Sequence, residues 1–156
     1  MENQQAPTTM WDVFKMDRRR EIDGVTFEYP GGIRVTLARA GGGNTQFARS
    51  HEIHMRPVRA ALGLKEALPE AKQRRLIANI YADSVIRKFE TNVSPDPTVE
   101  DWQPVVLWSD GSVKPVDRDL LVELLILLPD LMDEIVKDST NLANFRKEQL
   151  QADAGN

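Results

Sequence analysis

The sequence of 156 residues contains no cysteine. This absence excludes disulfides, thiolate catalysis and metals held by cysteine. The sequence also lacks a long hydrophobic run: the longest, Leu120 to Leu128, is interrupted by Glu123 and ends at Pro129. A membrane-spanning helix needs roughly 20 apolar residues. Met1 to Met10 is polar and has no apolar segment of the signal-peptide kind. We therefore expect a cytoplasmic protein without a membrane span.

The length of the chain fits one domain, and its two halves carry net charges of opposite sign. A chain of this size fits a single domain. We predict one α+β domain over residues 11–146, between a flexible N-terminus (1–10) and a flexible C-terminal tail (147–156). Residues 1–90 carry 15 Lys/Arg against 11 Asp/Glu, a net charge of +4, and residues 91–156 carry 5 against 13, a net charge of −8. Such an acidic C-terminal half repels nucleic-acid phosphates.

The N-terminal half contains a β-hairpin signal. Residues 25–29 and 33–39 alternate apolar and polar side chains, and Pro30-Gly31-Gly32 between them is a turn sequence. Asn44 or Thr45 can cap a following helix, which Pro57 should kink or interrupt.

Two further helical regions follow. Apolar residues at three- and four-residue spacing predict a helix from Pro69 to Phe89. A short hairpin is predicted over residues 102–116, restricted to edge pairing by its prolines. Asp117 can then cap a helix that reaches Leu128, and Pro129 begins another. The predicted fold is therefore α+β and mostly helical, with an N-terminal β-hairpin and a C-terminal helical pair.

Candidate chemical sites are weak in this sequence. His51 and His54 could share a metal, but zinc hydrolases place the two histidines four residues apart and no third ligand is evident nearby. Gly41-Gly42-Gly43 before a helix could hold a phosphate, yet it lacks the Gly-Lys-Ser/Thr ending of a P-loop. We predict no catalytic residue, no cofactor and no metal.

Basic residues leave two interpretations open. With Trp11 and Phe14 close to the first group, they could form a nucleic-acid patch. Alternatively they pair with the acidic C-terminal half of the same chain or of another copy, which we favour. The residues concerned are Arg18, Arg19, Arg20, Arg49, Arg56, Arg59, Lys72, Arg74 and Arg75.

The aliphatic run from Leu120 to Leu128 also has two interpretations. A helix that is apolar on nearly every side must be covered on nearly every side. It is either a central core helix or a helix with one face covered by another chain.

A series of motifs follows in order over residues 24–146: the Val25–Leu37 hairpin, the glycine-rich turn, Arg56-Pro57, Ile80-Tyr81-Ala82, Trp102, Asp110-Gly111, Leu128-Pro129-Asp130-Leu131, Ile135, Leu142 and Ala143-Asn144-Phe145-Arg146. In the order of these motifs the chain resembles the tail assembly chaperones of long-tailed (siphophage-like) bacteriophages.

The resemblance implies a non-enzymatic protein of the host cytoplasm that binds the tape measure protein and helps to recruit tail tube subunits. Many genes of this family also give a longer product by ribosomal frameshifting. Within this hypothesis the candidate residues for client binding or self-association share an apolar character and a C-terminal position: Leu121, Leu124, Leu128, Leu131 and Met132. The alternatives are a structural virion protein of the tail or connector, and a small nucleic-acid-binding regulator.

Overall fold

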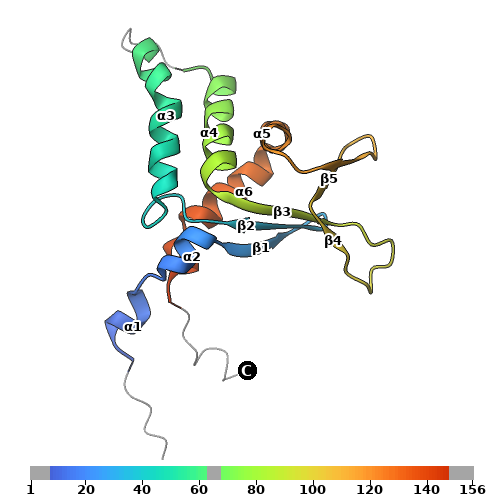
Figure 1. Ribbon diagram of the computed structural model, residues 1–156, viewed down its shortest axis with the longest axis horizontal. Coiled ribbons are helices and arrows are strands. Elements are labelled where there is room, and N and C mark those ends of the chain that lie inside the picture. The colour runs from blue at the N-terminus through green and yellow to red at the C-terminus, as the bar shows by residue number, and fades with distance from the viewer. Residues whose placement is uncertain (1–7, 63–67, 148–156) are drawn as a thin grey trace, which may run out of the picture.

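The computed structural model describes residues 8–62 and 68–147. These residues form an α+β fold in which α4, α5 and α6 pack over one face of a four-stranded antiparallel sheet (Figure 1). The elements follow in the order α1 (Met10–Phe14), α2 (Arg18–Asp23), β1 (Val25–Tyr29), β2 (Ile33–Leu37), α3 (Thr45–Leu62), α4 (Glu70–Ser84), β3 (Ile86–Asn92), β4 (Trp102–Gln103), β5 (Val105–Leu107), β6 (Val113–Pro115), α5 (Arg118–Leu127), α6 (Pro129–Thr140) and the 3₁₀ helix η1 (Leu142–Phe145).

The fold class predicted from the sequence is confirmed, including the hairpin and the C-terminal helical pair. Strands β1 and β2 pair antiparallel, with Phe27 opposite Val35. The turn between them uses Gly31 and Gly32, whose φ angles of 96° and 73° favour glycine. Asp117 caps α5 by accepting a hydrogen bond from the Leu120 amide, and Pro129 occupies the first turn of α6.

The predicted helix from Pro69 to Phe89 is confirmed as far as Ser84 and is wrong over its last five residues. Helix α4 ends at Ser84, and the chain continues as β3, which pairs antiparallel with β2 so that Phe89 lies opposite Val35. Phe89 fits a helical spacing with Val85, but Phe89 lies in the sheet. Strand pairing with a segment about fifty positions upstream overrides the local pattern.

Helix α3 also differs from its prediction. Pro57 lies inside the continuous span Thr45–Leu62 instead of ending it. Asn44 does not act as a side-chain cap. It is buried, and its amide nitrogen donates to the carbonyls of Arg39 and Ser84. Asn44 therefore ties the loop after β2 to the end of α4.

The N-terminal and C-terminal regions of the chain are joined to each other. We predicted a flexible N-terminus over residues 1–10, of which the structure describes residues 8–10. These three residues are ordered, because Thr9 caps α1 in a reciprocal pair of hydrogen bonds with Asp12. Behind α1, the Asp17 amide donates to the Phe145 carbonyl and the Lys147 amide donates to the Lys15 carbonyl. Residues 1–7 and most of the predicted tail, 148–156, lie outside the described residues.

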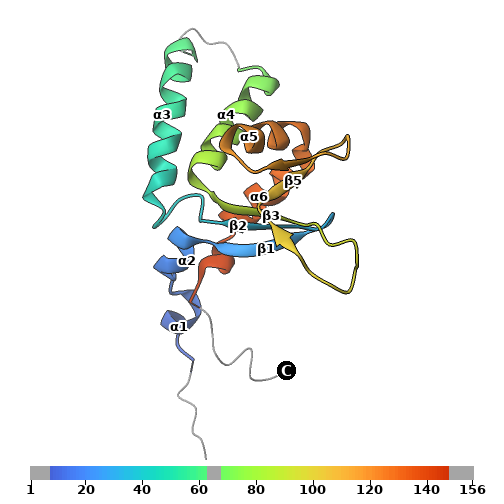
Figure 2. The same cartoon turned by 45° about the vertical axis from the view of Figure 1, so that its right-hand side comes forward.

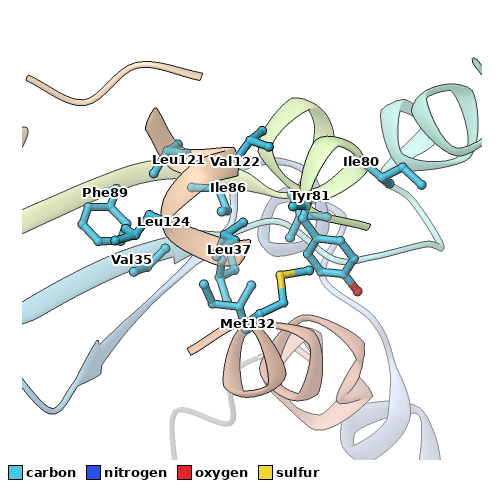
Figure 3. Packing of buried hydrophobic residues seen from close by; sticks show 14 of the residues in the cluster. Val35, Leu37, Ile80, Tyr81, Ile86, Phe89, Leu121, Val122, Leu124 and Met132 are labelled. Atoms are coloured by element: carbon cyan, nitrogen blue, oxygen red, sulfur yellow. The ribbon is translucent and has the colours of Figure 1, made fainter. Parts of the chain in front are cut away.

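The core lies between the sheet and helices α4, α5 and α6. Strands β2 and β3 contribute one face of apolar side chains, and the three helices close over it (Figures 1 and 3). The labelled members of this cluster in Figure 3 are Val35, Leu37, Ile80, Tyr81, Ile86, Phe89, Leu121, Val122, Leu124 and Met132. Phe145 is also fully buried, at the end of η1.

The structure contains no helix, among residues 8–62 and 68–147, with the length and apolar character needed to cross a bilayer.

Candidate protein-binding surface

The five candidate residues at the C-terminal end have different environments. Leu121, Leu124 and Met132 are buried, with 7%, 7% and 8% of their surface exposed, and they belong to the core (Figure 3). Leu131 is half-buried against that core. Leu128 is 47% exposed. Of the five, only Leu128 offers a large apolar surface to another protein without unfolding.

An apolar groove lies where α5 ends beside the β5–β6 hairpin. It has a volume of about 500 Å³ and is lined by Leu107, Trp108, Ser109, Leu124, Leu127 and Leu128. We call it the α5 groove. Leu107 and Leu127 are 60% and 59% exposed, and Val113, paired with Leu107 across the hairpin, is 55% exposed. Side chains of this size, grouped and unburied, are typical of a surface that another protein covers.

Charge around the α5 groove is mainly negative. Asp110 lies in the hairpin turn, Glu123 lies one helical turn before Leu127, and Asp130 follows Leu128. Glu123 and Asp130 are exposed and form no ion pair within the described part of the chain. The hydroxyl and amide of Ser112 donate to Asp110 and hold the pKa of its carboxyl below its usual value. One cation, Lys114, lies over the Trp108 ring at 4.5 Å.

A second apolar surface lies on α1. Met10, Trp11 and Phe14 are 67%, 70% and 62% exposed, and with Lys15 and Met16 they line a hollow of about 670 Å³. Residues three and four apart share one face of a helix, so the three large side chains lie together. We call α1 with Lys15 and Met16 the N-terminal arm. It was not among the sequence-predicted candidates for protein binding, although Trp11 and Phe14 were considered beside the first basic group.

A polar cluster joins three helices on another side of the molecule. Asp83 of α4 accepts from Arg118 of α5 and lies 2.8 Å from Nε2 of His54 on α3. The Arg118 guanidinium, followed by His54, holds the pKa of Asp83 below its usual value. These side chains satisfy one another, so the cluster has an evident structural role.

The residues weighed above as weak candidates for a metal or phosphate site make contacts within the chain itself. His51 packs beside Phe47 while His54 faces Asp83, so the two histidines have different partners. Within the described residues no group of three metal-ligating side chains occurs. The glycine-rich loop closes over the buried Glu21 carboxylate, which Arg39 contacts. A phosphate in that loop would meet a carboxylate of the same charge.

Three of the basic residues have carboxylate partners close to them in the described part of the sequence. Arg56 and Arg59 contact Glu52 on the same helix, and Arg74 contacts Glu70. These partners belong to the more basic half of the sequence. The arginines are spread over α2, α3 and α4, with no single stripe shared by all of them.

Comparisons of this chain with protein-family models, with curated proteins and with solved structures give no match.

Proposed function

We propose that this protein is a non-enzymatic phage tail assembly chaperone that binds the tape measure protein in the host cytoplasm and helps to recruit tail tube subunits around it. The observation that supports this proposal most is the α5 groove. Leu107, Leu127 and Leu128 stay exposed beside a core that is already filled by other side chains. A folded domain that keeps such a surface suits the temporary cover of an apolar partner.

The chemistry of the groove fits a helical client. Leu124 and Leu127 lie three residues apart on α5, and Leu128 follows at its C-cap, so their side chains form an apolar face that can receive the apolar face of another helix. Only the few residues that line the groove would contact the client. A stable interface, in contrast, buries about 800 Å² of surface on each partner. A small contact gives modest affinity, and a chaperone must release its client. The net charge of −4 helps to keep a complex with an aggregation-prone client in solution.

Co-expression with the tape measure protein of the same phage or prophage tests the proposal. We expect the wild-type chain to keep the tape measure protein in the soluble fraction and to co-purify with it. Leu127→Asp should abolish both effects, because it places a charge where the client's apolar face would dock. Ile53→Asp is a matched control, since Ile53 is 61% exposed on α3, outside the groove. An insoluble client in the presence of the folded wild-type chain would disprove client binding.

Mass spectrometry of purified virions gives an independent test. A chaperone acts during assembly and is absent from the finished tail. A stoichiometric amount of this chain in mature particles would instead identify a structural virion protein.

A further inference from the structure

The base of the N-terminal arm is hydrogen-bonded to the C-terminal part of the described chain, whereas its apolar face is exposed to solvent. Its base is fixed by the isolated antiparallel bridge between Met16 and Arg146 and by the hydrogen bond from the Lys147 amide to the Lys15 carbonyl. Its helix is closed at the start by the Thr9–Asp12 capping box. Met10, Trp11 and Phe14 nonetheless remain at least 62% exposed. A short helix with ordered ends and a bare apolar face has the form of a docking element.

Charge around the arm is mainly positive. The exposed cations near it are Lys15, Arg18, Arg19 and Lys147, and Arg146 lies over the Phe14 ring at 5.0 Å. The neighbouring carboxylates are Asp12 and Asp17, and both accept hydrogen bonds as helix caps. Among these described residues the cations outnumber the carboxylates, so the net charge beside the arm is positive.

The α5 groove has the opposite character. Its apolar lining includes Leu124, Leu127 and Leu128, and the arm presents Met10, Trp11 and Phe14. Its flanking carboxylates, Asp110, Glu123 and Asp130, outnumber the cation that the described part of the chain places beside it, Lys114 over Trp108. Two apolar faces flanked by charges of opposite sign are complementary.

The arm and the groove of one chain lie at opposite ends of the molecule. Figures 1 and 2 both show α1 below the sheet and α5 with β5 above it on the far side. Because the base of the arm is fixed at residues 145–147, the arm cannot reach the groove of its own chain. A contact between these surfaces must join two molecules.

We propose that the N-terminal arm of one copy docks in the α5 groove of a second copy. Trp11 and Phe14 fill the space between Trp108 and Leu127, and Lys15 and Arg19 approach the carboxylates of Asp110 and Glu123. The contact is heterologous, because each copy uses two different surfaces, so it leaves a free arm at one end and a free groove at the other. The small area makes the contact weak and dependent on concentration.

The docked arm covers the surface to which we assign the client, and this part of the inference rests on the proposed function. A client helix and the arm of a second copy then compete for one groove. Self-association keeps the apolar groove covered until a client replaces the arm.

Sedimentation velocity over a concentration series tests the docking without any client. We expect wild-type chains to associate, and the association to weaken as salt rises, because the approaching charges are exposed. The arm variant Trp11→Ser/Phe14→Ser and the groove variant Leu127→Asp should each weaken association by about a hundredfold, as expected for aromatic anchors and their pocket. Glu123→Lys should weaken it less. Ile53→Asp should associate like the wild type.

Mixing the two defective variants tests the polarity of the contact. The arm variant keeps an intact groove, and the groove variant keeps an intact arm. We therefore expect the mixture to form heterodimers that do not grow further, while each variant alone stays monomeric. A wild-type chain that is monomeric throughout the series would overturn the proposal. So would association that survives both variants, or a mixture that stays monomeric.

Competition separates this inference from the proposed function. A peptide of Thr9–Arg20 should bind the wild-type groove and not the Leu127→Asp variant, and a client helix should displace it. Client binding without self-association would overturn the docking and leave the chaperone function standing. Self-association without client binding would do the reverse.

Discussion

The leucines of α5 look alike in the sequence and differ in their surroundings. Leu121, Leu124 and Leu125 face the sheet and α4 with at most 7% of their surface exposed, whereas Leu127 is 59% exposed. The same substitution should therefore have different effects at a core position and at a surface position of this one helix.

We expect Leu124→Asp to destabilise the fold by about 4 kcal/mol or more, because it places an unpaired charge in the core. Leu127→Asp should change the free energy of unfolding by only about 0.5 kcal/mol, since water remains in contact with the new carboxylate. Urea unfolding followed by circular dichroism measures both. Equal losses for the two variants would contradict the assigned orientation of α5.

Tyr29 provides a second prediction for a single residue. Its hydroxyl donates to Asp138 at 2.7 Å, which joins β1 to α6. Burial, together with that carboxylate, raises the pKa of Tyr29 well above its usual range. We expect Tyr29→Phe to lower the free energy of unfolding by about 1 kcal/mol, typical of a hydrogen bond to a charged acceptor that is partly exposed. A double-mutant cycle with Asp138→Asn measures the coupling, and a coupling of zero would disprove the contact.

At the scale of elements, the junction of α3, α4 and α5 depends on one carboxylate. Asp83 joins His54 to Arg118, and Arg118 also donates to Asn79 at 2.8 Å. Its folded pKa lies below the value of about 3.9 in the unfolded chain. The stabilisation is therefore complete above the unfolded pKa and is lost as the pH falls through the folded pKa.

We expect Asp83→Asn to be less stable than the wild type near neutral pH, with a difference that shrinks below about pH 4. Chemical unfolding at a series of pH values measures this difference. Glu123→Gln removes an exposed carboxylate without an ion pair among the described residues, and its difference from the wild type should stay small at every pH. A constant difference for Asp83→Asn would contradict the role of its charge.

The elements also show what the sequence could and could not predict. The β1–β2 hairpin and the start of α5 depend on neighbours in the chain, namely the Pro30-Gly31-Gly32 turn and the Asp117 cap. Strand β3 depends on β2 for its pairing, and residues 86–92 lack the alternation that would identify a half-buried strand. Local spacing therefore favoured a helix there.

Only part of the candidate surface could be predicted from the sequence, and the reason is similar. Every position from Leu124 to Leu128 is apolar, so no period distinguishes the inner leucines from the outer ones. Their orientation follows from the packing of α4 and the β5–β6 hairpin, which are distant in sequence. Leu128 was identified as a candidate, whereas Leu107 and Leu127 were not.

At the scale of the whole molecule, Phe145 joins the end of the described chain to its beginning. Its side chain is fully buried, and its carbonyl accepts from the Asp17 amide. The Arg20 guanidinium also donates to the carbonyls of Asn144 and Arg146. Residues 142–147 therefore support α2 and the arm together.

We expect Phe145→Ala to lower the free energy of unfolding by about 3 kcal/mol, as for other buried aromatic truncations. Hydrogen exchange should accelerate at the Asp17 amide more than at the amides of β2. Leu142→Ala lies in the same 3₁₀ helix with 46% of the leucine exposed, so it should leave both measurements nearly unchanged. Unaltered exchange at Asp17 in Phe145→Ala would contradict the coupling.

The hydrogen bond from Lys147 to Lys15 has a practical consequence for anyone who labels this protein. A fluorophore or affinity tag fused after residue 147 leaves the domain beside the aromatic face of Trp11 and Phe14, as does one fused before Thr9. A tag at either of these two positions would then cover the same patch and block its binding. The loop at Ser94–Thr98, between β3 and β4, lies away from that patch and is a better site for a reporter (Figure 1).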